Sequence, residues 1–424
     1  ADRHISADRH IFANLGFLSA FSEDVPVSGS FDVIEGFAEI NVPVWADMPF
    51  AESLEIDASV RIADYSTVGS TTSYAFGGVW KPVSDLRVRA SFNRAVRAPN
   101  IGELFSPQVT APGQVFVDPC DIDNIGLGSS TRAANCAQLV PAGFDPDPTT
   151  TAFAVDITSG GNPNLSEEKA ASFTIGFAYT PSFVPGLAIV ADYYDIDIED
   201  GIISGVSDEL IAANCVDAAS INNNFCAAVE RDPATGVIQS VFATSLNLSA
   251  ITGKGIDYEL TYDFDLDDLV GHALGDFTAS LAGTYLMERE NIAFSDFPES
   301  VDVLDEEIGF PEHFLNASLA WRSGPWSADY GFNYQSSQFL TSGFPAVERE
   351  TIEADRFLLA DAKTGNAFVH YIGGTYDMNE AVQVSLRVNN LTDREPFFGA
   401  PQGNRFRPVS AIGRSVQFGV RARF

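Results

Sequence analysis

Four cysteines are the residues of this chain whose type and spacing most directly suggest covalent chemistry. They fall into two close pairs, Cys120 with Cys136 and Cys215 with Cys226, and each pair lies in a stretch expected to be a loop. A zinc site would need CxxC spacing and a nearby histidine, and both pairs lack them, so disulfides are the preferred interpretation. We therefore predict two disulfides, each closed within one loop, in periplasmic or extracellular space.

Other residues that could ligate a metal or catalyse a reaction lack the spacing that such chemistry requires. The five histidines form no HExxH pattern, and no serine stands in a GxSxG turn. The tripeptide Gly253-Lys254-Gly255 precedes a strand-like segment, whereas a phosphate loop precedes a helix. The acidic runs 192–200 and 263–268 are candidate calcium sites, although neither has EF-hand spacing. We predict no enzyme and no cofactor, with calcium as the one candidate ion.

The charge balance excludes one class of partner. The 424 residues include 24 Lys and Arg against 58 Asp and Glu, which gives a formal net charge of -34. Such a chain repels phosphate backbones, so we expect no nucleic acid partner. Its 45% of hydrophobic residues are enough for a large core or one large barrel. A run of about 18 apolar residues is missing, so no helical membrane span is predicted.

Many segments alternate apolar and polar residues, which is typical of strands with two different faces. In 172–179 the aromatic and aliphatic residues from Phe173 to Tyr179 stand opposite small and polar ones. In 256–264 a similar apolar face stands opposite a face that carries Asp257 and other acidic residues. No dry core would accept that second face. The pattern therefore favours strands that face lipid on one side and water on the other.

Two further segments give a strand boundary and a strand with ambiguous faces. Segment 31–44 is expected to form a strand that ends at Val42-Pro43. In 187–200 the run YYDIDIED can be placed with either parity outward, so its faces stay unassigned.

The connections between these segments alternate in length. Short turns are followed by long loops, a rhythm typical of outer-membrane barrels with short periplasmic turns and long extracellular loops. Aromatic residues at strand ends suit the interfacial girdles of such a barrel. We predict an all-β fold, a transmembrane antiparallel β-barrel of about fourteen strands. The long loops are expected at 95–168, 201–248, 289–311, 337–366 and 390–411.

Four segments, in chain order, carry recognisable motifs. They are SFNRAVRAPNIGELFSP, where Pro99 lacks an N–H and ends a strand near Arg97, then GNPNLSEEKAASFTIGF, ITGKGIDYELTYDF and VNNLTDREPFF. Together they resemble the barrel of TonB-dependent outer-membrane receptors. The positions that match the family's motifs are Arg94, Arg97, Pro99, Asn100, Glu103, Leu104, Asn162, Pro163, Leu165, Gly255, Asp257, Asn390 and Leu391. The terminal strand, with Phe418, Val420 and Phe424, resembles the signature that the barrel assembly machinery recognises.

The resemblance implies active import of a scarce nutrient such as a siderophore, cobalamin or an oligosaccharide across the bacterial outer membrane. It implies three further partners: the TonB complex, acting through a plug, outer-membrane lipid with lipopolysaccharide, and the assembly machinery. Receptors of this family have about twenty-two strands around a plug. Neither the plug nor about eight of those strands is expected in this sequence, so the resemblance covers the C-terminal part of the barrel.

Two other functions stay open. A barrel of about fourteen strands could be a passive diffusion channel. A secreted β-sandwich that binds a ligand would also have two-faced strands, but it does not explain the aromatic outer faces.

Overall fold

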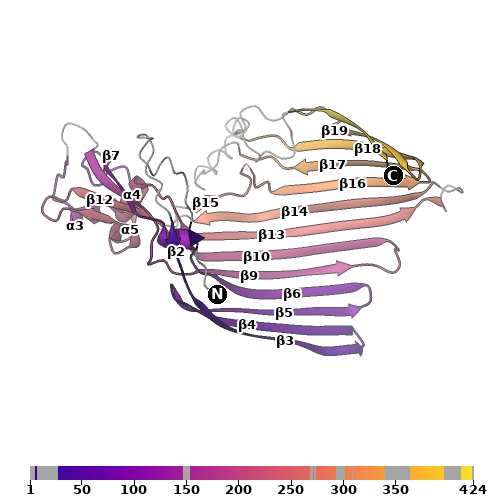
Figure 1. The fold of residues 1–424 in the computed structure, drawn as a ribbon, viewed down its shortest axis with the longest axis horizontal. Coiled ribbons are helices and arrows are strands. Elements are labelled where there is room, and N and C mark those ends of the chain that lie inside the picture. Colours follow the sequence, from indigo (N-terminus) through magenta and orange to yellow (C-terminus); the bar gives the residue numbers. More distant parts are fainter. Residues whose placement is uncertain are drawn as a thin grey trace.

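The structure is a computed structural model whose main body is one antiparallel sheet, in which strands that follow each other in the chain lie side by side (Figure 1). The sheet contains fourteen strands, with β3 and β20 at its two ends. The fourteen-stranded all-β fold is therefore confirmed. The described residues are 5–6, 27–146, 153–267, 271, 274–292, 301–307, 309–339, 363–395 and 412–422.

Thirteen strands of this sheet are long, and β15 is a three-residue strand that pairs with β14. A separate short pair joins β1 (Ile5–Ser6) to β2 (Ser28–Gly29). The strands of the large sheet are β3 (Val33–Met48), β4 (Ala51–Tyr65), β5 (Gly69–Val83), β6 (Leu86–Arg97), β9 (Glu168–Tyr179), β10 (Leu187–Ile203), β13 (Leu246–Asp265), β14 (Asp276–Ile292), β15 (Val301–Val303), β16 (His313–Ser323), β17 (Trp326–Gln335), β18 (Ala367–Asn379), β19 (Val382–Asn389) and β20 (Ser415–Ala422).

The strand registers gather apolar side chains on one face of the sheet. Directly paired residues of antiparallel strands project to the same side. Ile175 of β9 pairs with Ala90 of β6 and with Tyr193 of β10, and Tyr193 pairs in turn with Ile256 of β13. Ile175 is 43% exposed, although it lies in the middle of the sheet. An exposed apolar face of this extent fits contact with lipid, and we call it the outer face.

Register also settles the faces of β10, which the sequence left open. Because Tyr193 stands on the outer face, Asp195 and Asp197 stand there too, further along the strand toward the cap-side end, and Asp195 pairs with Lys254 of β13. On the opposite, inner face, Arg89 of β6 reaches across β9 to Asp192 of β10, with Nε 2.8 Å from Oδ1. The ion pair crosses over Gly176, where a Cβ would lie 2.0 Å from Asp192 Oδ1. The inner face is therefore braced by a charged pair that only glycine permits.

Aromatic residues mark the two edges of the apolar band. Trp326 packs on Tyr376 with ring centroids 4.3 Å apart at the end with the short turns, and Tyr285 stacks on His313 at 4.6 Å toward the other end. Phe277 and Tyr285 on β14 are eight residues apart, which is about 27 Å along a strand and about 21 Å after a tilt near 40°. This height is close to the band of about 25 Å that such barrels present to lipid.

One strand boundary predicted from the sequence is wrong. Strand β3 does not end at Val42-Pro43 but continues to Met48, with a register shift between Pro43 and Trp45. Proline is tolerated at a bulge and on an edge strand, because its missing N–H need not serve a second neighbour. Among the described residues β3 has β4 as its sheet neighbour, so Pro43 meets both conditions.

The sequence predicted long loops at 95–168 and 201–248. Most of these two segments folds together into one small subdomain at one end of the sheet (Figure 1). We call residues 109–160 and 204–245 the cap. Its four-stranded sheet has the order β11-β12-β8-β7, and β8 and β12, from different loops, are parallel. The cap elements are β7 (Val109–Phe116), α3 (Arg132–Leu139), β8 (Phe153–Gly160), α4 (Asp208–Asp217), α5 (Asn224–Ala227), β11 (Val229–Arg231) and β12 (Ile238–Thr244).

The cap has its own hydrophobic core. Phe116, Ile211, Val216, Phe225 and Val241 are fully buried in a cluster that also includes the cysteines. The only other buried apolar cluster among the described residues is the pair Ala367 and Val369 at the start of β18. None of the described helices is long and apolar enough to cross a membrane.

Candidate functional site

Two disulfides hold the cap together. Cys120 is bonded to Cys136, with their Cα atoms 5.4 Å apart, and Cys215 to Cys226, with Cα atoms 4.4 Å apart. Each bond lies within one of the two loops, which confirms the predicted pairing. The second bond links the short helix α5 to α4, so it fixes the position of α5 relative to α4.

Two ion pairs join the loops to each other. Arg231 from the second loop binds Asp118 from the first, with Nη1 2.7 Å from Oδ2 and Nη2 2.9 Å from Oδ1. The Asp118 side chain is completely buried, and that of Arg231 is 9% exposed. Likewise, Arg132 Nε lies 2.7 Å from Asp217 Oδ1. Buried pairs with this geometry fix how the two loops meet, because separating either pair would leave a charge without compensation.

The Asp217 carboxyl is held in its charged form. Burial alone would raise its pKa, but hydrogen bonds from the Arg132 guanidinium and from the Ser129 backbone N–H outweigh it. The pKa of Asp217 therefore lies below its ordinary value.

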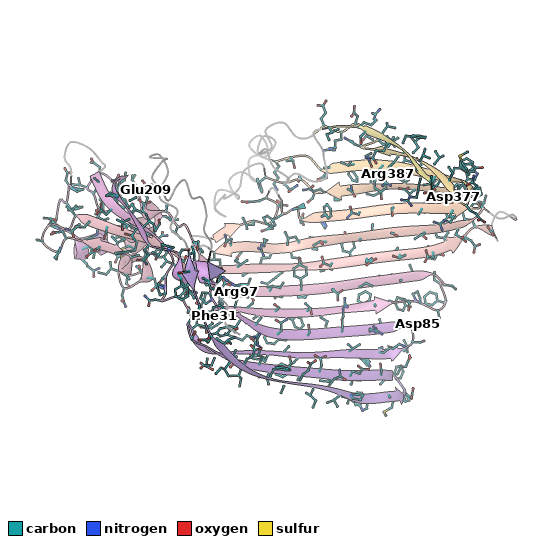
Figure 2. All side chains as sticks on the ribbon, in the orientation of Figure 1. Phe31, Asp85, Arg97, Glu209, Asp377 and Arg387 are labelled. Atoms are coloured by element: carbon teal, nitrogen blue, oxygen red, sulfur yellow. A yellow bond between two sulfur atoms is a disulfide. The ribbon has the colours of Figure 1, made fainter. Side chains whose placement is uncertain are left out.

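The first two family motifs meet beneath the cap, near Arg97 in Figure 2. We call their residues 97–105 and 162–168 the rim. After β6, residues 101–105 form the short helix α2 (Ile101–Phe105), within the segment 95–168 that the sequence predicted to be a long loop. Asn100 and Glu103 make a capping box, with Glu103 N 2.9 Å from Asn100 Oδ1 and Asn100 N 2.7 Å from Glu103 Oε2. Arg97 Nη1 donates to Glu103 Oε2 at 3.1 Å, and the same guanidinium forms an ion pair with Glu168 at the start of β9.

The second motif packs against the first. Asn162 donates its backbone N–H to Glu103 O at 2.8 Å, and its Nδ2 donates to Ser245 O at 2.9 Å. Its Oδ1 accepts from Asn164 N at 2.9 Å. Pro99, Leu104 and Leu165 are buried beside it, and Pro163 is exposed. The rim therefore connects α2, β9 and the start of β13, and it supports the cap from below.

The remaining motif residues lie elsewhere and have structural contacts. Gly255 lies under Tyr194, whose Oη is 2.4 Å from the place of a Cβ, and Asp257 accepts from Thr284 Oγ1 at 2.6 Å. Asn390 has φ 51°. Its Nδ2 donates to Arg394 O and its Oδ1 accepts from Arg394 N, both at 2.8 Å.

The other predicted positions that the structure describes face outward or lie in the turn after β19. Arg94 pairs with Tyr74 on the outer face, and Leu391 N donates to His370 O at 2.8 Å. Phe418 and Val420 stand exposed on β20, while Phe424 lies outside the described residues. The motifs thus do not converge on one binding site.

A pocket of about 460 Å³ lies where the cap meets the rim. The sequence did not predict this pocket, because its lining residues come from both loops and from the turn at Asn162-Pro163-Asn164. None of its twelve described lining residues has an ionisable side chain. Side-chain amides and one aromatic ring are prominent in the lining, and they belong to Gln108, Asn162, Asn164, Asn224, Phe242 and Asn247.

The cap has an excess of acidic over basic residues. Its two segments contain eleven acidic residues and two basic ones, Arg132 and Arg231, and both arginines are engaged in ion pairs. Within the described part of the chain, no three His, Cys, Asp or Glu side chains are arranged to hold a metal ion. The calcium expectation for the acidic runs stays a prediction.

Comparison with known proteins gives the family. The family model "TonB dependent receptor-like, beta-barrel" matches residues 21–391. A mutant of the ferric enterobactin receptor of Pseudomonas aeruginosa is similar over 96% of this chain and 46% of its own, with 18% identity and a TM-score of 0.56. The siderophore receptor PirA of Acinetobacter baumannii is similar over 96% and 47%, with 14% identity and a TM-score of 0.57. At these identities the likeness shows the fold.

The chain thus spans about half the length of these solved structures. No curated protein matches its sequence. With the family match over residues 21–391, the two-faced antiparallel sheet and the long loops on one end, this chain belongs to the family of TonB dependent receptor-like beta-barrels.

Proposed function

We propose that this chain is the barrel part of an outer-membrane receptor that imports a scarce, bulky nutrient with energy from the TonB complex. The observation that carries the proposal is the cap. A disulfide-bonded subdomain with its own core and a pocket at its base covers one end of a sheet whose outer face is apolar. Such an element suits the capture of a ligand before transport.

The cap also argues against the passive channel. A diffusion channel needs an unobstructed aqueous entrance. Here two long loops fold into a subdomain at one end of the sheet. Membership of a receptor family favours the same choice. Proteins of this family are transport receptors and not enzymes, and the family resides in the bacterial outer membrane.

Orientation follows from the two ends of the sheet. The short turn with Asp85 and the β18–β19 turn, close to Asp377, lie at the end away from the cap (Figure 2). The described end of β20 lies there too, because Ala422 pairs with Val382 beside the β18–β19 turn. Outer-membrane barrels keep short turns in the periplasm. The cap would then face the outside of the cell, where an oxidising environment preserves its disulfides. The terminal strand would be the segment read by the barrel assembly machinery, and the outer face would meet lipid and lipopolysaccharide.

The test is uptake by cells that express the complete receptor. Ferric siderophores, cobalamin and oligosaccharides are supplied in turn to isogenic strains with and without TonB, and the accumulated nutrient is measured. We expect uptake of one nutrient class that is lost without TonB or after the proton gradient is collapsed. Equal uptake in both strains would favour the channel and refute the proposal.

A further inference from the structure

We infer that the pocket at the base of the cap binds a neutral, hydroxyl-rich ligand, an oligosaccharide. The inference rests on the proposed import function and names the class of ligand. It starts from the pocket's lining, in which no charged side chain occurs among the described residues. Charged residues make up 19% of the chain, so a pocket of twelve residues without one is suited to an uncharged ligand.

The amides of the pocket are held in place by the framework. Asn247 Nδ2 donates to Ser166 O at 3.0 Å and to Asp200 O at 2.8 Å. Gln108 Nε2 donates to Gly161 O at 3.1 Å, and Asn162 is bonded on both of its side-chain atoms. Amides held in this way present their remaining lone pairs in fixed directions. A preorganised set of polar groups lowers the entropy lost on binding.

Two further amides are free to act on a ligand. Asn164 and Asn224 are exposed, and their side chains make no hydrogen bond with any other described residue. A carboxamide both donates and accepts, so it can bond two adjacent hydroxyl groups of a sugar at once. Asn224 stands at the first turn of α5, which the Cys215–Cys226 disulfide holds in position.

An aromatic ring completes the lining. Phe242 of β12 is 37% exposed at the pocket. The face of an aromatic ring carries partial negative charge, and the C–H groups on one face of a pyranose carry partial positive charge, so the two surfaces stack. A peptide would need several apolar subsites for its side chains, whereas seven of the twelve lining residues are polar. The combination of amides with one ring fits a saccharide better.

The charge of the cap selects against the opposite class of ligand. Eleven acidic residues against two paired arginines create a negative potential around the pocket. A multiply charged anion, such as a ferric tris-catecholate, would approach against this potential. A neutral oligosaccharide would not be affected by it.

The test is calorimetric titration of the complete receptor in detergent micelles. The probes are maltohexaose, xylohexaose, cellohexaose and laminarihexaose, with a ferric tris-catecholate and a neutral hexapeptide for comparison. We expect at least one hexasaccharide to bind and the anion not to bind. Phe242→Ala should weaken that binding about tenfold, and Asn224→Ala about fivefold. Asn222→Ala, an exposed asparagine in the same segment, is the matched control and should have no effect.

Three results would overturn the inference. They are binding of the anion or the peptide but of no saccharide, saccharide binding that both pocket variants leave intact, and saccharide binding lost equally in the control. Disulfide mapping of each variant establishes that the cap has formed. The inference and the import function fail separately: TonB-dependent uptake of a ferric ligand without saccharide binding refutes only the former.

Discussion

Removal of the Asp118 carboxylate should unfold the cap locally while the barrel stays intact. Asp118 is completely buried, accepts two bonds from Arg231, and also accepts from Cys120 N at 2.8 Å. In Asp118→Ala the guanidinium of Arg231, 9% exposed, keeps Gly236 O at 2.9 Å as a neutral partner. Leaving a buried charge without its counter-ion costs about 3 to 5 kcal/mol.

Hydrogen exchange measured by mass spectrometry is the appropriate assay, because the barrel would mask a local change in a global melting curve. A loss of about 3 kcal/mol corresponds to exchange roughly a hundredfold faster at the amides of β12. The amides of β13 and β14, which belong to the large sheet, should exchange at the wild-type rate. Replacing both partners, as in Asp118→Leu with Arg231→Met, should recover much of the protection, since no charge is left buried.

The control is Asp123→Ala, which removes an exposed acidic side chain of the same segment and should change stability by less than about 0.5 kcal/mol. Unchanged exchange in Asp118→Ala would refute the claim that this ion pair holds the two loops together. So would a double variant that is as unstable as the two single changes combined.

Three further perturbations address the disulfides, the outer face and the acid sensitivity of the cap. Replacing Cys215 and Cys226 by serine should destabilise the cap by roughly 3 kcal/mol, since the bond closes a loop with a sequence separation of 11, and limited proteolysis should then cut this segment first. Phe177→Arg on the outer face should destabilise the barrel by about 2 to 4 kcal/mol in refolding into lipid vesicles, whereas Thr174→Arg on the inner face should have a much smaller effect, and equal losses would contradict the assignment of faces. The pKa of Asp217 is lower in the folded cap than its ordinary 3.8, so its contribution to stability is present above this value and is lost as pH falls below it. The protection factors of the cap amides, which correct for the slowing of intrinsic exchange by acid, should therefore fall below about pH 4, and Asp217→Asn should remove this part of the pH dependence.

The sequence by itself determined the features that depend on neighbouring residues. Alternation from Phe173 to Tyr179 predicted a two-faced strand, and the structure has β9 there, with its apolar side outward. Pro99 predicted the end of β6 at Arg97, because a residue without an N–H cannot extend the ladder. The close spacing within each cysteine pair predicted the two disulfides. All three depend on local chemistry, which a linear pattern contains.

The tertiary structure decided the features that depend on distant partners. β10 alternates equally well with either parity, and only its pairing with β9 and β13 assigned its faces. The cap escaped prediction because its short strands pair across loops, with Val241 of β12 beside Ile157 of β8. Asp118 and Arg231 are 113 positions apart in the chain, and neither residue alone indicates a partner. The pocket with Asn224 and Phe242 exists only after both loops fold, because burial and long-range pairing create it and no local pattern encodes them.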